Sequence, residues 1–133
     1  MKFASVLSAL SLLTLSSASV SLTRVTWNGI YDNPNQTFTV IACAEWAAAN
    51  NYTTFKDVPS FPYIGGAYVV SGYNSPGCGT RYSILDQQTN VTVEVTVVDA
   101  ALQGFVVSLE ALNKLTNDNA QDLGSIQAVV TKI

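Results

Sequence analysis

Short stretches with alternating apolar and polar residues dominate the chain after position 18. The clearest alternation is Val91–Val97, within a predicted strand at Val91–Val98: its four valines fall on one side of an extended chain, with Thr and Glu on the other. A period of two is typical of a strand with one buried face. Other stretches rich in β-branched and aromatic residues predict further strands at Arg24–Tyr31, Thr37–Ala42, Ala67–Val70, Arg81–Leu85 and Ser125–Ile133.

Two segments have a helical pattern instead. Glu45–Ala49 predicts a short helix, and Ser108–Leu115 predicts a longer one. The first residue of the longer segment is a natural N-cap, and leucines at every third position form an apolar stripe that we assign to the core. Gly- and Pro-rich segments, among them Gly65-Gly66 and Gly72–Gly79, predict turns between the strands. The chain is therefore mainly β in one domain, and the pattern alone only weakly favours a barrel over a sandwich.

The first residues have the pattern of a secretory signal. Lys2 precedes an apolar run, Phe3–Leu15, and small residues follow up to Ala18. We expect a signal peptide at 1–18 and a mature domain at 19–133. A membrane anchor is disfavoured because the apolar run is well short of the roughly 20 residues that cross a bilayer.

Composition narrows the candidate chemistry. The chain has 9 acidic and 6 basic residues, for a net charge of −3, and removal of Lys2 with the signal makes it one unit more negative. Nucleic acid and membrane surfaces are therefore not expected partners. The sequence contains no histidine, which excludes histidine-dependent triads and histidine-bridged zinc sites, and its two thiols alone cannot complete a usual zinc site. We expect no metal and no cofactor. Any catalysis would have to use carboxylates.

The only two cysteines, Cys43 and Cys78, predict one disulfide in an exported protein. A loop of this length is stabilised by about 4 kcal/mol in the chain-entropy view. Three Asn-x-Thr triplets make Asn35, Asn51 and Asn90 acceptors for N-glycans.

The segment Gly72-Tyr73-Asn74-Ser75-Pro76-Gly77-Cys78-Gly79-Thr80 resembles the Gly-aromatic-Asp-Ser-Pro-x-Cys-Gly-Thr-Cys motif of the cerato-platanin family. The resemblance covers most of the mature chain. Its other landmarks are Tyr31-Asp32, Cys43, Val58–Pro62, Gly65-Gly66, Val98-Asp99, Gly104-Phe105 and Leu109–Leu115.

This resemblance implies a six-stranded double-psi β-barrel with one or two short helices. It also implies a secreted protein, outside the cell or in the cell wall, that binds chitin-like N-acetylglucosamine oligomers or glucan. The family loosens cell walls without hydrolysis and can elicit plant defence, so the implied partners are cell-wall polysaccharide and plant immune receptors. We expect a monomer that could self-assemble at interfaces.

The chain departs from the family pattern in two places. Arg81 replaces the second cysteine of Cys-Gly-Thr-Cys, and the chain ends at Ile133 before the cysteine expected as its partner. The remaining pair, Cys43 with Cys78, matches the other family bridge. Tyr73-Asn74 replaces Trp-Asp, which keeps an aromatic ring and loses a carboxylate.

The predicted carbohydrate contacts are all residues at family landmarks: Tyr31, Asp32, Gly72, Tyr73, Asn74, Ser75, Asp99 and Gly104. Asp99 is the leading carboxylate, although a lone acid at a strand end is more often a turn or cap residue. Tyrosine rings offer stacking faces to sugars, with core packing as the alternative. Trp27 and Trp46 are interpreted as core residues.

Two other functions stay open. A true endo-glycan hydrolase needs two carboxyl groups at a defined separation, and only Asp32 joins Asp99 as a candidate. A surface-active structural protein without a sugar site is the third hypothesis, because the mature chain has few charges and many apolar residues.

Overall fold

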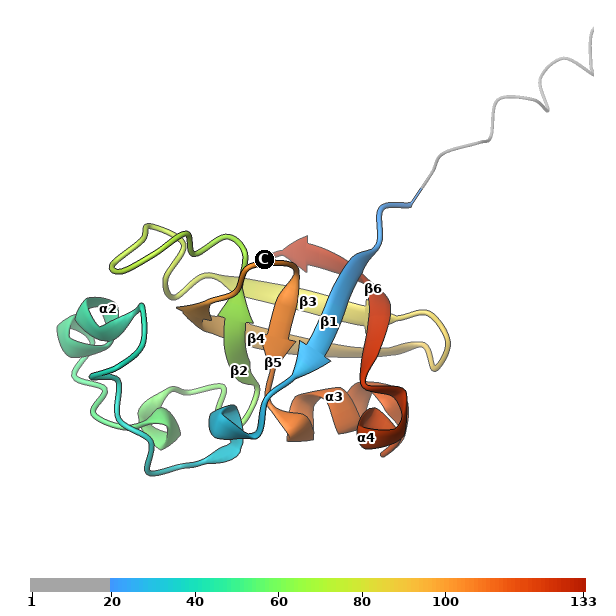
Figure 1. Cartoon of the computed structure of the whole chain (residues 1–133), viewed down its shortest axis with the longest axis horizontal. Coiled ribbons are helices and arrows are strands. Elements are labelled where there is room, and N and C mark those ends of the chain that lie inside the picture. Colours follow the sequence, from blue (N-terminus) through green and yellow to red (C-terminus); the bar gives the residue numbers. More distant parts are fainter. Residues whose placement is uncertain (1–19) are drawn as a thin grey trace, which may run out of the picture.

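Six strands close into a barrel in the computed structural model, which describes residues 20–133 (Figure 1). The strands are β1 (Thr23–Trp27), β2 (Ile64–Ala67), β3 (Arg81–Asp86), β4 (Val91–Ala100), β5 (Phe105–Val107) and β6 (Ser125–Lys132). Their order around the barrel is β1-β5-β2-β4-β3-β6. The pairs β1–β5 and β2–β4 are parallel and the others antiparallel. The predicted six-stranded barrel is confirmed.

The helical elements lie outside the strands, beside the barrel and below it (Figure 1). They are η3 (Gly29–Asp32), α2 (Ala44–Ala49), η4 (Phe55–Asp57), α3 (Leu109–Thr116) and α4 (Ala120–Leu123). Both predicted helices are present. In α3 the Ser108 hydroxyl accepts a hydrogen bond from the Ala111 N–H at 3.0 Å, as expected of an N-cap. Leu112 and Leu115 of its apolar stripe are fully buried.

Two predicted strands are wrong or misplaced. Thr37–Ala42 forms turns, and its only bridge pairs Thr37 with Thr54, while Phe38 and Ile41 are buried. Phe38 and Ile41 therefore contribute to core packing and not to a sheet, while Val40 is exposed. The strand expected at Ala67–Val70 instead ends at Ala67.

The glycines interpreted as a turn, Gly65 and Gly66, lie inside β2. A Cβ at Gly65 would collide with the backbone of Val106 in β5, so the bare backbone allows the strands to approach closely. The register between β2 and β4 shifts between the two glycines, which marks a bulge.

Two other strand boundaries differ from the prediction. The strand expected at Arg24–Tyr31 ends at Trp27, because Asn28 caps η3 by accepting a hydrogen bond from the Ile30 N–H at 3.0 Å. No strand was predicted at β5, which is only three residues long; the sequence identified Gly104-Phe105 there only as a landmark of the family resemblance. Such a short element has too few positions for a period to be recognised.

Two hydrophobic cores share strand β4. The valines at 93, 95 and 97 are buried in the core that also contains residues of β1, β3, β5 and α3. Val98 belongs to a second core, with Phe38, Phe55 and Ile64, under the segment that carries α2 and η4. This second core holds that segment against the side of the barrel.

The predicted disulfide is confirmed between Cys43 and Cys78, whose Cα atoms are 5.5 Å apart. It ties the N-terminal side of α2 to the loop between β2 and β3. The predicted signal peptide at 1–18 and the proposed mature start at 19 lie outside the described residues. Within residues 20–133, no helix has the length and apolar character needed to span a membrane.

Candidate functional site

Asp99, the leading candidate acid, accepts three hydrogen bonds from the protein itself. The Tyr31 hydroxyl donates to Oδ2 at 2.9 Å, and the N–H groups of Ala42 and Ala100 donate to Oδ1 at 3.1 and 2.8 Å. Asp99 lies near the end of β4, so the carboxylate fastens the turn segment at Ala42 to the barrel. Its first role in the structure is therefore to position other groups.

Tyr31 is buried, with 5 % of its surface exposed, and its ring packs on Phe55 at a centroid distance of 6.0 Å. Burial raises the pKa of its hydroxyl well above the usual range, and the charge of Asp99 and the hydrogen bond to it raise the pKa further. The hydroxyl therefore stays a donor to Asp99. The expectation that this ring stacks on a sugar does not fit its burial.

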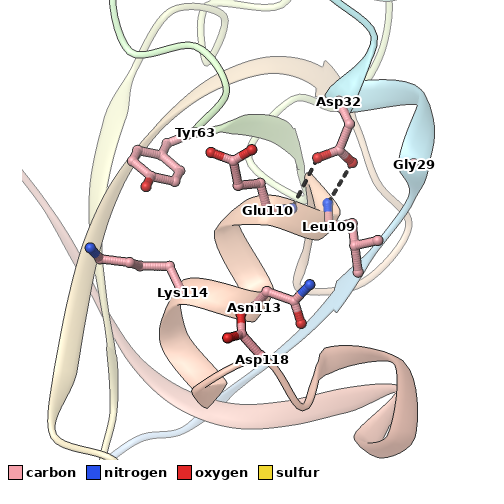
Figure 2. A pocket seen from close by; sticks show the side chains of 8 residues that line it. All are labelled: Gly29, Asp32, Tyr63, Leu109, Glu110, Asn113, Lys114 and Asp118. Atoms are coloured by element: carbon pink, nitrogen blue, oxygen red, sulfur yellow. Dashed lines mark hydrogen bonds between the residues drawn. The ribbon is translucent and has the colours of Figure 1, made fainter.

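Asp32 faces a different element from its neighbour Tyr31. Its two carboxylate oxygens accept hydrogen bonds from the first N–H groups of α3, those of Leu109 at 2.7 Å and Glu110 at 2.9 Å (Figure 2). These N–H groups have no partner within the helix, and a carboxylate there also complements the helix dipole. Asp32 thus joins η3 to α3, and among residues 20–133 no hydrogen bond joins it to Asp99.

An open hollow of about 630 Å³ lies beside this cap (Figure 2). Its lining side chains come from η3, α3 and the residues around them: Asp32, Tyr63, Leu109, Glu110, Asn113, Lys114 and Asp118, with Gly29. Carboxylate groups and an ammonium group are mixed in it. Each Asp32 oxygen accepts one hydrogen bond from the helix and keeps a second acceptor site.

The loop that carries the motif reaches Asp99 through Ala42. The Asn74 N–H donates to the Ala42 carbonyl at 2.8 Å, while the Ala42 N–H donates to Asp99. Asn74 has a left-handed φ of 56°. Tyr73 is 67 % exposed, and its hydroxyl lies 3.4 Å from a Glu45 carboxylate oxygen. The structure thus brings Tyr31, Asp99 and the motif loop into one connected network.

The remaining motif residues have mostly backbone roles. The Ser75 hydroxyl accepts from the Gly77 N–H at 3.3 Å, and a Cβ at Gly72 would meet no atom within 4 Å. Gly104 lies in the turn before β5 with φ +57°, where a Cβ would collide with the Arg24 carbonyl. Gly104 is needed for the close approach of that turn to β1.

Two open hollows meet at Trp46. The Asn74 hollow, about 420 Å³, is lined by Glu45, Trp46, Ala49, Asn74, Ser75, Pro76 and Cys78. The Arg81 hollow, about 540 Å³, is lined by Trp46, Asn50, Tyr52, Val58, Pro59, Ser60, Gly79, Arg81 and Thr96. We call the two together the Trp46 surface. It combines aromatic rings, amides and hydroxyls, and includes two of the predicted contacts, Asn74 and Ser75.

Three residues of this surface were not expected at a site. Trp46 packs edge-on against Phe38 and Tyr52, with centroid distances of 6.4 and 5.5 Å, as a core residue would, yet it remains half-buried and lines both hollows. Arg81 is exposed and forms an ion pair with Glu94. The departure of Arg81 from the motif was the only sequence signal at that position, and Tyr52 gave none.

The sequon asparagines are all exposed: Asn35, Asn51 and Asn90. Asn51 and Asn90 have left-handed backbone conformations, with φ of 62° at both. Their acceptance of glycans stays a prediction. Within residues 20–133, no group of three potential ligand side chains is placed to hold a metal ion.

The fold and surface define a class: a disulfide-bridged, six-stranded β-barrel with a motif loop anchored beside open polar and aromatic hollows. The chain belongs to the cerato-platanin family, whose family model, described as Cerato-platanin, matches residues 23–133.

Relatives and solved structures agree with this assignment. Allergen Asp f 15 of Aspergillus fumigatus is 37 % identical over 106 residues, which are 78 % of this chain and 68 % of the relative. Cerato-platanin 3 from M. perniciosa has a TM-score of 0.81 at 36 % identity, covering 84 % of this chain and 93 % of that one. The solution structure of the fungal elicitor Cerato-Platanin, at 24 % identity and a TM-score of 0.74, covers 83 % and 91 % and shows the same fold.

Proposed function

We propose that this protein is secreted, binds cell-wall polysaccharide on the Trp46 surface and loosens the polymer without hydrolysing it. The ligand class is a chain of chitin-like N-acetylglucosamine units or glucan. The single observation that carries the proposal is the junction of two open hollows at one tryptophan, lined by aromatic, amide and hydroxyl groups. Membership in the cerato-platanin family supports it.

The chemistry of this surface suits a glycan. Aromatic rings offer apolar area to the C–H faces of pyranose rings, and amides and hydroxyls bond sugar hydroxyls. Trp46 and Tyr52 supply the rings, and Asn74 and Asn50 the amides. Two adjoining hollows accommodate successive sugars of one chain. Contacts made to a single chain replace its hydrogen bonds to neighbouring chains, so binding alone loosens their packing.

A hydrolytic mechanism is less well supported because both candidate acids already serve as acceptors. Asp32 holds two N–H groups of α3, and Asp99 holds the Tyr31 hydroxyl and two N–H groups. A general acid must present a proton to the glycosidic oxygen and leave room for its partner carboxyl group. Both carboxyl groups instead accept hydrogen bonds that hold segments of the protein together.

Sedimentation with insoluble polymers tests the proposal. The protein is mixed with chitin, cellulose and β-glucan, bound protein is measured, and reducing ends are assayed in parallel. Arg81→Ala should weaken binding several-fold because Arg81 lines one hollow. Tyr73→Ala should do the same because Tyr73 borders the other hollow: it precedes the lining residue Asn74, and its hydroxyl lies 3.4 Å from the lining residue Glu45. Steady release of reducing ends would overturn the non-hydrolytic mechanism.

Tyr68→Ala is the matched control, because Tyr68 is also an exposed tyrosine, at 55 %, but its ring packs on Phe105, which lines neither hollow. It should bind as the unaltered protein does. Equal losses in the Tyr68 and Tyr73 variants would place the polymer elsewhere. Film or foam formation with no affinity for any of the polymers would favour the surface-active alternative.

Recognition by plants is the second part of the proposal. A protein of the same fold is described as a fungal elicitor, and an exposed motif loop offers a surface to an immune receptor. An oxidative burst in leaf tissue treated with the purified protein would support it. A burst of equal size with heat-aggregated protein would count against recognition of the folded surface.

A further inference from the structure

Another hollow, of about 520 Å³, lies where the turn after β3 meets α4 and the start of β6. Its polar lining is Asp86, Gln87, Gln88, Asn119, Ser125 and Gln127, with two threonines, and Leu22, Leu123 and Ile126 supply apolar groups. It shares no residue with the Trp46 surface or with the hollow of Figure 2. We call it the Asp86 hollow.

The feature that requires explanation is the burial of a carboxylate there. Asp86 is only 2 % exposed. Its Oδ1 accepts a hydrogen bond from the Gln88 N–H at 2.9 Å, which shapes the turn. Among residues 20–133, no group donates a hydrogen bond to the other oxygen, Oδ2. This oxygen is not completely shielded from solvent. Because Asp86 is one of the residues that line the hollow, this oxygen can still accept hydrogen bonds from a ligand there.

A buried carboxylate without a full set of partners is unfavourable, so the hollow is suited to a ligand that donates hydrogen bonds. Asp86 is the only charged residue in the lining, which contains no Lys or Arg. The charge selects a cationic donor. In the Asp86 hollow, the hydroxyls of Thr89 and Thr116 are already engaged with the carbonyls of Leu115 and Leu112.

The rim of the hollow supplies neutral polar groups. The side chains of Gln87, Gln88 and Gln127 are exposed, and among the described residues none makes a hydrogen bond that would hold it in place. Amides offer donors and acceptors together, which matches hydroxyl groups. Leu22 and Leu123, 45 % and 55 % exposed, give a wall for C–H groups. The ligand should therefore combine one ammonium group with several hydroxyls.

We propose that the Asp86 hollow binds a glucosamine unit, the amino sugar of a deacetylated chitin chain, with its ammonium group on Asp86 Oδ2 and its hydroxyls on the rim amides. The inference rests on the proposed function, because it takes the ligand to be a cell-wall glycan. It adds a second subsite that distinguishes free amino groups from acetylated ones. An acetamido group has no charge to offset the buried carboxylate.

Titration calorimetry with two tetramers tests this subsite. The protein should bind fully deacetylated chitosan tetramer, and Asp86→Asn should reduce that affinity about tenfold, the order expected for one charge-assisted hydrogen bond. Binding of the acetylated chitin tetramer should not change. Because asparagine keeps an oxygen for the Gln88 N–H, the melting temperature of this variant should change little.

Asp122→Asn is the control. Asp122 is exposed on α4, next to Leu123, and its replacement removes the same charge outside the lining. An equal loss in both variants would overturn the proposal in favour of general attraction to an acidic protein. So would the absence of chitosan binding by the unaltered protein. If chitin binding survives in that case, only the subsite fails; if Tyr73→Ala leaves all polymer binding intact, the proposed function fails instead.

Discussion

Individual carboxylates in this protein serve structural roles that the family motif alone does not reveal. Asp32 caps α3 and Asp99 holds Tyr31 and Ala42, so the two acids expected at a sugar site are both satisfied by protein donors. The alternative interpretation of Asp99 as a turn or cap residue describes these contacts well. Its influence on a ligand passes through Ala42 to the motif loop.

Replacement of Asp99 measures that role. Asp99→Ala leaves the buried Tyr31 hydroxyl and two N–H groups without an acceptor and should cost about 3 kcal/mol of unfolding free energy. Asp99→Asn keeps one oxygen for the N–H groups, and the hydroxyl can turn to accept from the amide, so it should cost about 1 kcal/mol. Urea unfolding of both variants provides the measurement.

The control for this series is Tyr31→Phe, which removes the hydroxyl alone. Asp99→Ala made in that background should cost less than in the unaltered protein, because one unsatisfied group is already absent. If Asp99→Ala abolished polymer binding while stability stayed unchanged, Asp99 would contact the sugar directly and the structural interpretation would be wrong.

At the scale of elements, the motif loop and α2 meet at Gly79. A Cβ there would overlap the indole of Trp46, and Gly79 also has a positive φ of 82°. Only glycine satisfies both conditions at low cost. The glycine of the Cys-Gly-Thr segment thus determines where the tryptophan of α2 lies, and with it the boundary between the two hollows.

Gly79→Ala should therefore destabilise the protein by about 2 kcal/mol and move Trp46. A shift in tryptophan emission and a several-fold loss of polymer binding are the expected signals. Gly72→Ala is the matched control: it lies in the same loop, its added Cβ would meet no neighbour, and it should change neither property. An unchanged Trp46 surface in Gly79→Ala would contradict the proposed link.

At the scale of the whole molecule, the barrel is closed by β6, and its last strand residues run beside β3. Tyr82 pairs with Lys132, and the Ile133 N–H donates to the Arg81 carbonyl at 3.0 Å. Arg81 and Ile133 therefore face each other across the closing seam. In the family pattern a cysteine stands where Arg81 is, and the structure brings the end of the described chain to that residue.

A disulfide across this seam should stabilise the barrel. Opposed residues of antiparallel strands have Cα separations of about 4.5 to 5.5 Å, within the range of disulfides. The pair Arg81→Cys with Ile133→Cys should raise the unfolding free energy by up to about 4 kcal/mol. Thermal melting with and without reductant measures the gain, and thiol titration verifies the bond.

Arg81→Cys alone is the control and should bring no such gain. If the double variant had two titratable thiols without reductant, residues 81 and 133 would not lie opposite each other as proposed. A bridge that forms without raising the melting temperature would show that the seam is already held as firmly by the existing strand pairs.

Much of the barrel was predictable from local pattern, because a half-buried strand carries its own period. Val91–Val98 lies wholly within β4, and Ser108 caps α3 as expected. The disulfide followed from the cysteine count and export, and the six-stranded architecture from ordered landmarks. In the candidate site, the motif loop was found from sequence, because glycine and proline mark loops by their own conformational limits.

Other features depend on contacts between segments that are distant in the sequence, and only the tertiary structure decided them. The glycines of β2 form a strand because β5 lies against them, and Phe38 and Ile41 of Thr37–Ala42 are buried without forming one. Trp46 becomes a surface residue through its position between two loops. By itself the sequence determined most of the segments that extend, turn or coil, because those choices depend largely on neighbouring residues. Which side chains face water together depends on barrel closure, which no local pattern encodes.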